Sequence, residues 1–366
     1  MQITTDVLVA VLVSYLSFSN FLADSIINIL PKESAVEVEE INEAEETNIF
    51  DSLAILPSNF SSIPDILLNN REFQQATVIA AKEETKATTD DPLEAIVNIF
   101  CTLVTDEYIR TTTGTGFFID ADGVIMTNAH VAQFLLLEKS EEYESAECIV
   151  RNGNPAAPKY VAELLYIPPA WIQENAKNMS EAVPLGTGER DYALLYASET
   201  VSGEPLPAHF PALSFDSELL PLSTRENSVV AAGYPAANLI KNGASADLIP
   251  KKAETTVSEL YTFGSNYADV VAIRGSEVGE EGASGGPVLN EDGDVIGMIA
   301  TKGNDETDGA GSLRAITLSH IDRTITEETG FSLEENLNGN LSYRGEIFST
   351  TLAPFLMQIL ELSNRP

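Results

Sequence analysis

Short apolar runs separated by turn signals constrain the fold of this chain more than any other feature of the sequence. Each run has the length of a β-strand, and several are rich in β-branched and aromatic residues. Asp122-Gly123, between two of the runs, is a hairpin signal. The runs are residues 95–104, 116–119, 124–127, 147–150, 160–167, 191–197, 228–235, 255–261, 269–273, 287–289 and 295–300. This pattern predicts an all-β core.

A segment of small residues at 282–287 (GASGGP) leaves the backbone open to close approach by a substrate, and Ser284 is its candidate nucleophile. A serine hydroxyl is a weak nucleophile, so it requires an imidazole to accept its proton. His130 ends an apolar run that predicts a strand reaching the edge of a cleft. His209 and His320 lack such a setting and are more simply interpreted as surface or packed histidines.

The imidazole in turn requires a third group that orients it, and Asp191 is the candidate. It is a single carboxylate at the start of a run that predicts a buried strand. The order His130, Asp191, Ser284 is one of three chain orders in which this constellation recurs, and it accompanies the double β-barrel. Taken alone, residues 282–287 could equally be a β-bulge or a tight turn without chemistry.

Four ordered motifs carry a resemblance to a known family. They are residues 114–119 (GTGFFI), 127–131 (TNAHV), 191–195 (DYALL) and 282–287 (GASGGP), and together they resemble trypsin-like serine peptidases of the HtrA (Deg) type. We therefore expect an all-β fold of two six-stranded antiparallel β-barrels of the chymotrypsin/trypsin type. A helical N-terminal anchor and a C-terminal helix would flank the barrels.

The resemblance also implies a chemistry and a set of roles. Ser284 would attack a peptide carbonyl, His130 would carry the proton and Asp191 would orient His130, while the backbone N–H groups of Gly282 and Ser284 would form the oxyanion hole. The expected reaction is endoproteolysis of protein or peptide substrates. An esterase, or a catalytically silent barrel that binds peptide strands by β-addition, are the alternatives.

Counting from Ser284 by analogy places Val278 at the base of a specificity pocket, and Ile299, Ala300, Thr301 and Lys302 along its wall. Because no carboxylate occupies the base, we expect a small or medium apolar residue before the scissile bond. Because Lys302 lies at the rim of the pocket, an acidic residue before the scissile bond is the alternative. The sequence departs from the family where Ala283 replaces the usual Asn, and residues 331–366 are too few for a PDZ module.

Composition excludes some partners. The chain has 20 Lys and Arg against 56 Asp and Glu, a formal net charge of −36, so no basic stripe is available for a phosphate backbone. We expect no nucleic-acid partner. The acidic turns at 120–123 and 290–294 lack the remaining ligands of a calcium loop, so we expect no metal and no cofactor.

The N-terminal segment is apolar over residues 7–23, which suits a membrane anchor or uncleaved signal, although a buried core helix is the alternative. Glutamates dominate residues 33–48 and predict a solvated linker. We divide the chain into a hydrophobic segment (1–30), an acidic linker with a short helix (31–91), a serine protease domain (92–330) and a helical tail (331–366). An extracytoplasmic location, tethered to the membrane, follows from this interpretation.

Cys101 and Cys148 are the only two cysteines. In the closed barrel that the resemblance implies, the first strand neighbours the fourth, and these cysteines fall on those two strands. We therefore expect a disulfide, which would favour an oxidising compartment. Two unpaired buried cysteines in a reducing cytoplasm are the alternative.

Overall fold

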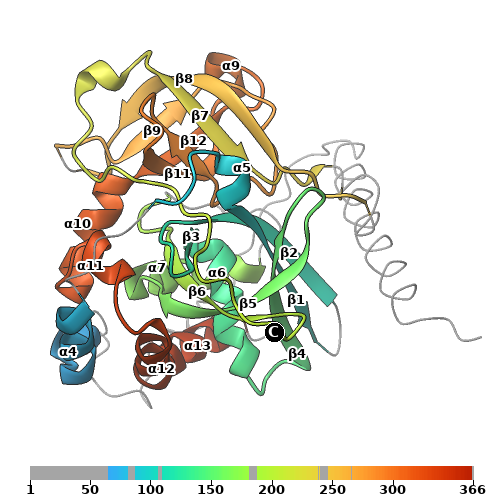
Figure 1. The fold of residues 1–366 in the computed structure, drawn as a ribbon, viewed down its shortest axis with the longest axis vertical. Coiled ribbons are helices and arrows are strands. Elements are labelled where there is room, and N and C mark those ends of the chain that lie inside the picture. The colour runs from blue at the N-terminus through green and yellow to red at the C-terminus, as the bar shows by residue number, and fades with distance from the viewer. Residues whose placement is uncertain are drawn as a thin grey trace, which may run out of the picture. The chain divides into compact units, whose positions relative to one another are not determined.

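The computed structural model describes residues 65–80, 87–105, 109–180, 188–237, 239, 246–264 and 266–364. Two closed β-barrels form the centre of this part of the chain (Figure 1). The predicted anchor at 7–23 and the acidic linker at 33–48 lie outside the described residues. Within those residues, no helix is both long and apolar enough to cross a bilayer.

The first barrel contains six antiparallel strands in the order β1-β2-β3-β6-β5-β4. Its strands are β1 (Ile96–Val104), β2 (Ile109–Phe118), β3 (Val124–Thr127), β4 (Ser145–Asn152), β5 (Ala157–Tyr166) and β6 (Ala193–Thr200). The hairpin between β2 and β3 turns at Gly123, whose φ of 97° favours glycine. The strand that ends before His130 is thus held in the middle of a closed sheet.

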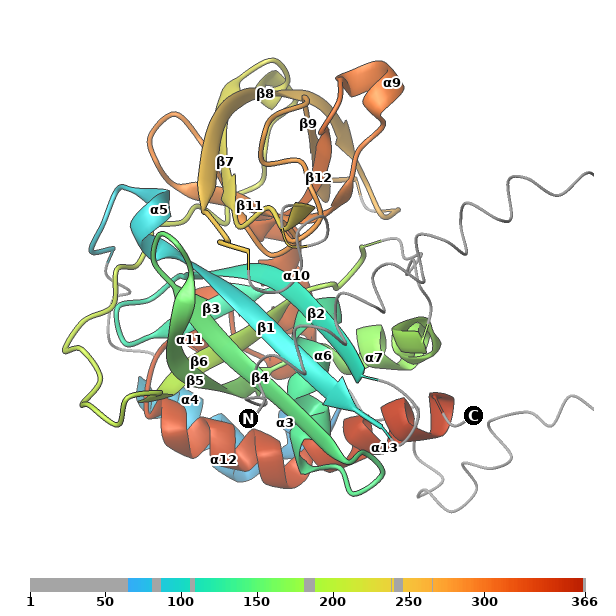
Figure 2. The same cartoon turned by 90° about the vertical axis from the view of Figure 1, so that its right-hand side faces the viewer.

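The second barrel repeats this topology, with β7 to β12 in the corresponding places (Figure 2). Its strands are β7 (Ser228–Gly233), β8 (Lys251–Tyr261), β9 (Val270–Ile273), β10 (Pro287–Leu289), β11 (Val295–Lys302) and β12 (Leu313–Thr317). All neighbouring pairs are antiparallel. The predicted all-β fold of two six-stranded antiparallel barrels is therefore confirmed.

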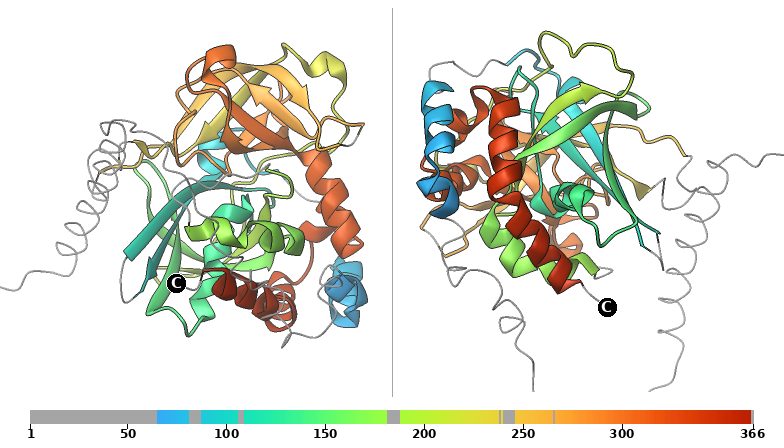
Figure 3. Two further views of the ribbon diagram at one scale, coloured as in Figure 1. Left: turned by 180° about the vertical axis from the view of Figure 1, so that it is seen from behind. Right: turned by 90° about the horizontal axis from the view of Figure 1, so that it is seen from below.

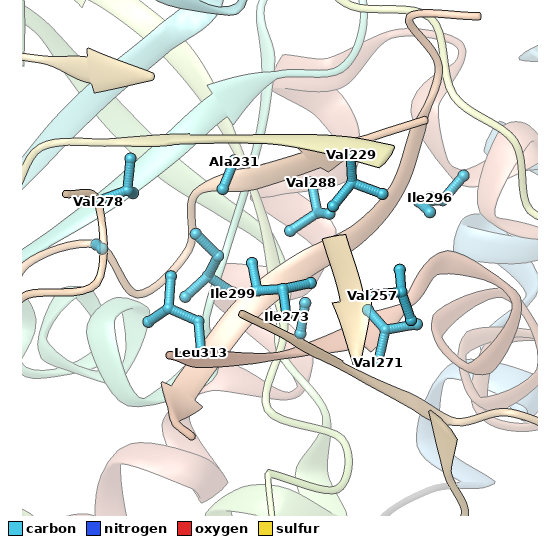
Figure 4. Close-up of a cluster of buried hydrophobic side chains, with 12 residues drawn as sticks. Val229, Ala231, Val257, Val271, Ile273, Val278, Val288, Ile296, Ile299 and Leu313 are labelled. Carbon is cyan, nitrogen blue, oxygen red and sulfur yellow. The ribbon is translucent and has the colours of Figure 1, made fainter. Parts of the chain in front are cut away.

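Side-chain alternation along the strands separates the interior of the second barrel from its outer face. Inward-facing residues, including Leu313 and Ala315 on β12 and Val271 and Ile273 on β9, form one buried apolar cluster (Figure 4). Arg314, which lies between Leu313 and Ala315, consequently faces outward. Burial of this cluster contributes about 25 cal/mol for each Å² of apolar surface removed from water.

Helices pack on the outside of the barrels, most of them on the first. The helices are α3 (Asp65–Asn69), α4 (Arg71–Ala80), α5 (Pro92–Ala95), α6 (Ala129–Leu136), α7 (Pro169–Asn175), α9 (Asp305–Asp308), α10 (Leu318–Thr329), α11 (Leu333–Leu337), α12 (Leu341–Thr351) and α13 (Ala353–Ser363). Helix α9 lies beside the second barrel, and α10 packs on β11 and β12 (Figure 1). The C-terminal helices fold back onto their own chain, because α12 packs on β5 and on α4, and α13 packs on α6 and α7 (Figure 3). The expected C-terminal helix is therefore a series of helices attached to the first barrel.

The two cysteines lie opposite each other on β1 and β4, where Cys101 and Cys148 are register partners. Their sulfur atoms form a disulfide. The bond joins the first and fourth strands of the first barrel, as the closed order of that barrel requires.

Candidate active site

His130 lies in the first turn of α6, directly after the end of β3. Its Nδ1 atom is 2.7 Å from Asp191 Oδ2, and its backbone N–H donates to Asp191 Oδ1 at 2.9 Å. The Asn128 side chain donates to the backbone oxygen of Asp191 at 2.8 Å. Asp191 thus holds both the ring and the backbone of His130, and its own position is fixed from the start of α6.

The charge balance of this pair favours protonation of His130. Burial of the imidazole opposes its charged form, but the negative charge of Asp191 and its hydrogen bond outweigh that cost and raise the pKa of His130 above its ordinary value. In the neutral ring, Nδ1 carries the proton and donates a hydrogen bond to Asp191. Nε2 then keeps a free lone pair. The pair can therefore accept a proton at Nε2.

An ion pair between half-buried Arg190 and buried Glu328 supports the turn that carries Asp191. Arg190 adopts a left-handed conformation (φ 56°), and its Nε atom lies 3.2 Å from Glu328 Oε1 on α10. Tyr166 donates a hydrogen bond to the other oxygen of Glu328. Burial raises the pKa of Glu328, while the Tyr166 hydrogen bond and the Arg190 charge oppose that rise. Helix α10 is thereby joined to the residue before Asp191.

The backbone around Ser284 is fixed so that alternate N–H groups stay without an acceptor. Two carbonyl oxygens accept from backbone N–H groups, Glu281 O from Ala236 at 2.6 Å and Ala283 O from Gly286 at 2.9 Å. The N–H groups of Gly282 and Ser284 belong to the same two peptide planes and point the opposite way, because the peptide bond is planar and trans. Neither donates to an acceptor within the described residues.

Thr115, on β2 of the first barrel, binds the carbonyl group between these two peptide planes and the one that follows them. Its N–H donates to Ser284 O at 2.7 Å, and its hydroxyl donates to Gly282 O at 2.7 Å. The same hydroxyl accepts from the N–H of Tyr234 at 2.9 Å. Gly285 has a φ of 89° and packs against the Thr115 carbonyl so closely that a Cβ atom would clash. The loop is therefore built before any substrate arrives.

The Ser284 side chain faces the same cleft as His130, but the two side chains are not hydrogen-bonded to each other. Ser284 Oγ instead donates to the backbone oxygen of Ala300 at 3.4 Å. His130, Asp191 and Ser284 all line a cleft of about 740 Å³. The structure thus brings the three sequence-predicted residues to one place, with the serine hydroxyl turned toward β11.

The residues predicted for the specificity pocket separate into two groups. Ala300, Thr301 and Lys302 line the cleft. Val278 and Ile299 instead belong to the buried cluster inside the second barrel, where each is 0% exposed (Figure 4). Neither side chain lines the cleft, so their place in a specificity pocket stays a prediction.

Several further residues line the cleft, and those on the second barrel escaped the sequence analysis. The outer face of the second barrel contributes Tyr261, Phe263, Val270, Arg314 and Ile316. Trp171 and Met179, from the long connection between β5 and β6, close another part of the cleft. Tyr261, Val270 and Ile316 lie side by side because of strand register, and no local sequence motif indicates that register. No group of His, Cys, Asp and Glu suited to a metal ion occurs in the described part of the chain.

The fold and this site define a class of protein. The profile of the trypsin-like peptidase domain matches residues 114–298, which is half of the chain and includes His130, Asp191 and Ser284. The chain belongs to the trypsin-like peptidase domain family.

Two further comparisons provide less information about the class of this protein. A solved structure, the active form of the Rv3671c protease from M. tuberculosis, is 19% identical, with a TM-score of 0.37 over 67% of this chain and 90% of that one. A search of curated proteins found no match.

Proposed function

We propose that this chain is a serine endopeptidase that cleaves exposed or unfolded protein segments through an acyl-enzyme. The observation that carries the proposal is the combination, in one cleft, of a His130–Asp191 pair with two unpaired N–H groups around Ser284. Membership of the trypsin-like peptidase domain family supports peptidase chemistry in general.

In this mechanism, Ser284 Oγ attacks the carbonyl carbon of the scissile peptide bond while its proton passes to His130 Nε2. The N–H groups of Gly282 and Ser284 bind the resulting oxyanion. The C–N bond then breaks as His130 returns the proton to the leaving amine. Water, deprotonated by the same imidazole, attacks the ester and releases the acid product with Ser284 restored. Asp191 holds the Nδ1 proton throughout and stabilises the imidazolium.

The Ser284 hydroxyl must leave Ala300 O before the attack. Rotation about the Cα–Cβ bond moves it between staggered wells without any change in the backbone. The 3.4 Å hydrogen bond that is lost is long and therefore weak. Substrate binding beside Ala300 provides a reason for the rotation, because a strand added along β11 would compete for that carbonyl group.

The filled interior of the second barrel limits the residue before the scissile bond. Val278 and Ile299 are buried, and neither bears a charge that could bind Lys or Arg. We therefore expect a small or medium apolar residue at that position. The HtrA-type resemblance belongs to the same proposal. The described part of residues 331–366 forms the helices α11 to α13.

A catalytically silent barrel is the second candidate. One observation favours it, namely that Ser284 Oγ bonds to Ala300 O rather than to His130. Such a protein would bind extended peptides in the same cleft by β-addition without cleaving them. An esterase would share the complete mechanism and differ only in the leaving group.

Hydrolysis of casein by the full chain, followed by gel electrophoresis and by mass spectrometry of the fragments, separates these candidates. Wild type should release peptides, and Ser284→Ala should lower the rate by several orders of magnitude. Ser202→Ala, which removes an exposed hydroxyl away from the cleft, is the matched control and should cleave like wild type. If wild type and Ser284→Ala behave alike on casein, the silent barrel is favoured. Activity on small esters alone indicates the esterase.

The location is a separate part of the proposal. We infer an extracytoplasmic chain tethered through residues 7–23, supported by the Cys101–Cys148 disulfide, because disulfides persist in oxidising compartments. Alkylation of acid-quenched cells should leave both thiols unmodified, and the full chain should remain in the membrane fraction after carbonate washing. Alkylated cysteines or a soluble chain would count against this location.

A further inference from the structure

The outer face of the second barrel forms an apolar floor in the cleft, with one cation set into it. Tyr261, Val270 and Ile316 lie side by side across β8, β9 and β12. Arg314 precedes Ile316 by two residues on β12, so both side chains project from the same face. Leu313 and Ala315 point into the barrel core. Arg314 is thus directed into the cleft by strand register.

The Arg314 guanidinium has a packing partner but no acceptor. Its Cζ atom lies 5.0 Å from the centre of the Tyr261 ring, a cation–π distance. Among the residues that the structure describes, its Nε atom is shielded from solvent and makes no hydrogen bond, and the guanidinium takes part in no ion pair. A buried donor without a partner costs roughly 1–3 kcal/mol. An acceptor supplied by a ligand would remove that cost.

Arg314 keeps its positive charge uncompensated although the chain is strongly acidic. Acidic residues exceed basic ones by 36, yet no carboxylate among the described residues forms an ion pair with Arg314. Lys302, at the rim of the same cleft, lies 3.6 Å from Glu281, and both of their side chains are exposed. A half-buried guanidinium offers a planar, permanently charged fork that matches a carboxylate, whereas the exposed lysine is screened by water.

The position of Arg314 relative to Ser284 gives it access to a bound peptide. Thr301 is the register partner of Arg314 across β11 and β12. Its neighbour Ala300 accepts the hydrogen bond from Ser284 Oγ. An extended peptide advances about 3.3 Å for each residue. A side chain within about four residues of the scissile bond can therefore reach the guanidinium.

We propose that Arg314 forms a subsite for an acidic side chain, so that this peptidase prefers substrates with Asp or Glu a few residues from the cleaved bond. The inference rests on the proposed endopeptidase function and adds a substrate class to it. The apolar floor of Tyr261, Val270 and Ile316 would hold the methylene groups of the acidic residue, and the guanidinium would bind its carboxylate through two hydrogen bonds.

The test uses internally quenched peptides that differ only by Glu or Gln, placed in turn at each of four positions on either side of the cleaved bond. Wild type should show kcat/KM about tenfold higher for Glu than for Gln at one position. This ratio corresponds to the free energy that a charge-assisted hydrogen bond contributes. In Arg314→Gln this ratio should fall to about one, and in Arg314→Glu a Lys peptide should replace the Glu peptide as the better substrate. Because each ratio is taken within one enzyme preparation, a partly unfolded variant does not alter it.

Two matched variants complete the design. Arg274→Gln removes a cation from the same barrel whose partner is the exposed Glu226, and it should keep the wild-type ratio. Lys302→Gln measures the contribution of the rim. A wild-type ratio near one at every position, or a ratio unchanged in Arg314→Gln, would overturn the subsite while cleavage itself stands. If no peptide is cleaved and Ser284 reacts with no serine-directed reagent, the endopeptidase proposal and the subsite both fall.

Discussion

At the scale of single residues, the candidate chemistry depends on a small number of contacts between side chains and backbone groups. His130, Asp191 and Ser284 could be selected from sequence because their residue types, with only three histidines to choose from, match the demands of nucleophilic catalysis. Thr115 and Arg314 could not be selected. A threonine that accepts and donates to two remote loops, or an arginine on an outer strand face, has no local signal in the chain.

The first residue-scale prediction concerns pH. Neutral His130 is the proposed base, and Asp191 raises the pKa of His130, so kcat/KM should fall on acidification with a midpoint above the reference value of about 6.5. The effect of the raised pKa on the free energy of unfolding has the opposite dependence on pH. The raised pKa stabilises the folded chain below the unfolded pKa, and this contribution is lost as pH rises through the folded pKa. A rate profile that is flat from pH 8 to pH 4 would show that His130 is not the base.

The second residue-scale prediction concerns Thr115. Thr115→Val removes the hydroxyl that fixes Gly282 O and leaves the N–H of Tyr234 without an acceptor. We expect kcat to fall roughly tenfold or more with KM nearly unchanged, because the oxyanion hole acts mainly in the transition state. Thr115→Ser keeps the hydroxyl and should restore most of kcat. Equal kcat in the valine and serine variants would rule out this positioning role.

At the scale of elements, most strands were predictable, but β12 (Leu313–Thr317) was not among the predicted runs, and which strands are neighbours could not be predicted. Alternation and turn residues marked the strand runs, whereas the helix α7 inside the connection at 168–190 was not expected. The burial of Val278 and Ile299 in the cluster inside the second barrel could not be predicted for the same reason. Which residues share a face is decided by pairing across the sheet, and a single sequence does not specify that pairing.

The element-scale prediction concerns the link between α10 and the turn before Asp191. Arg190→Met leaves Glu328 buried without its cationic partner, so the free energy of unfolding should fall by about 1–3 kcal/mol, and kcat should fall as Asp191 loses support. Arg274→Met breaks an exposed pair with Glu226 and should cost less than about 1 kcal/mol. Urea unfolding and steady-state kinetics measure both changes. Equal losses in the two variants would show that the link does not support the site.

At the scale of the whole molecule, the double barrel followed from the motif order, and the arrangement of the C-terminal helices did not. Their apolar positions predict helices, but only the fold shows that α12 and α13 cover the first barrel. The net charge of −36 describes the surface as a whole. It gives no indication that one arginine faces the cleft without a counter-ion.

The central claim is that Ser284 is a nucleophile activated by His130. Labelling of the full chain with a serine-directed fluorophosphonate, followed by peptide mapping, tests it most directly. We predict one modified peptide that contains Ser284, with labelling lost in Ser284→Ala and strongly reduced in His130→Ala. Labelling that is absent from wild type, or that occurs on another serine, or that proceeds equally without His130, would contradict the account.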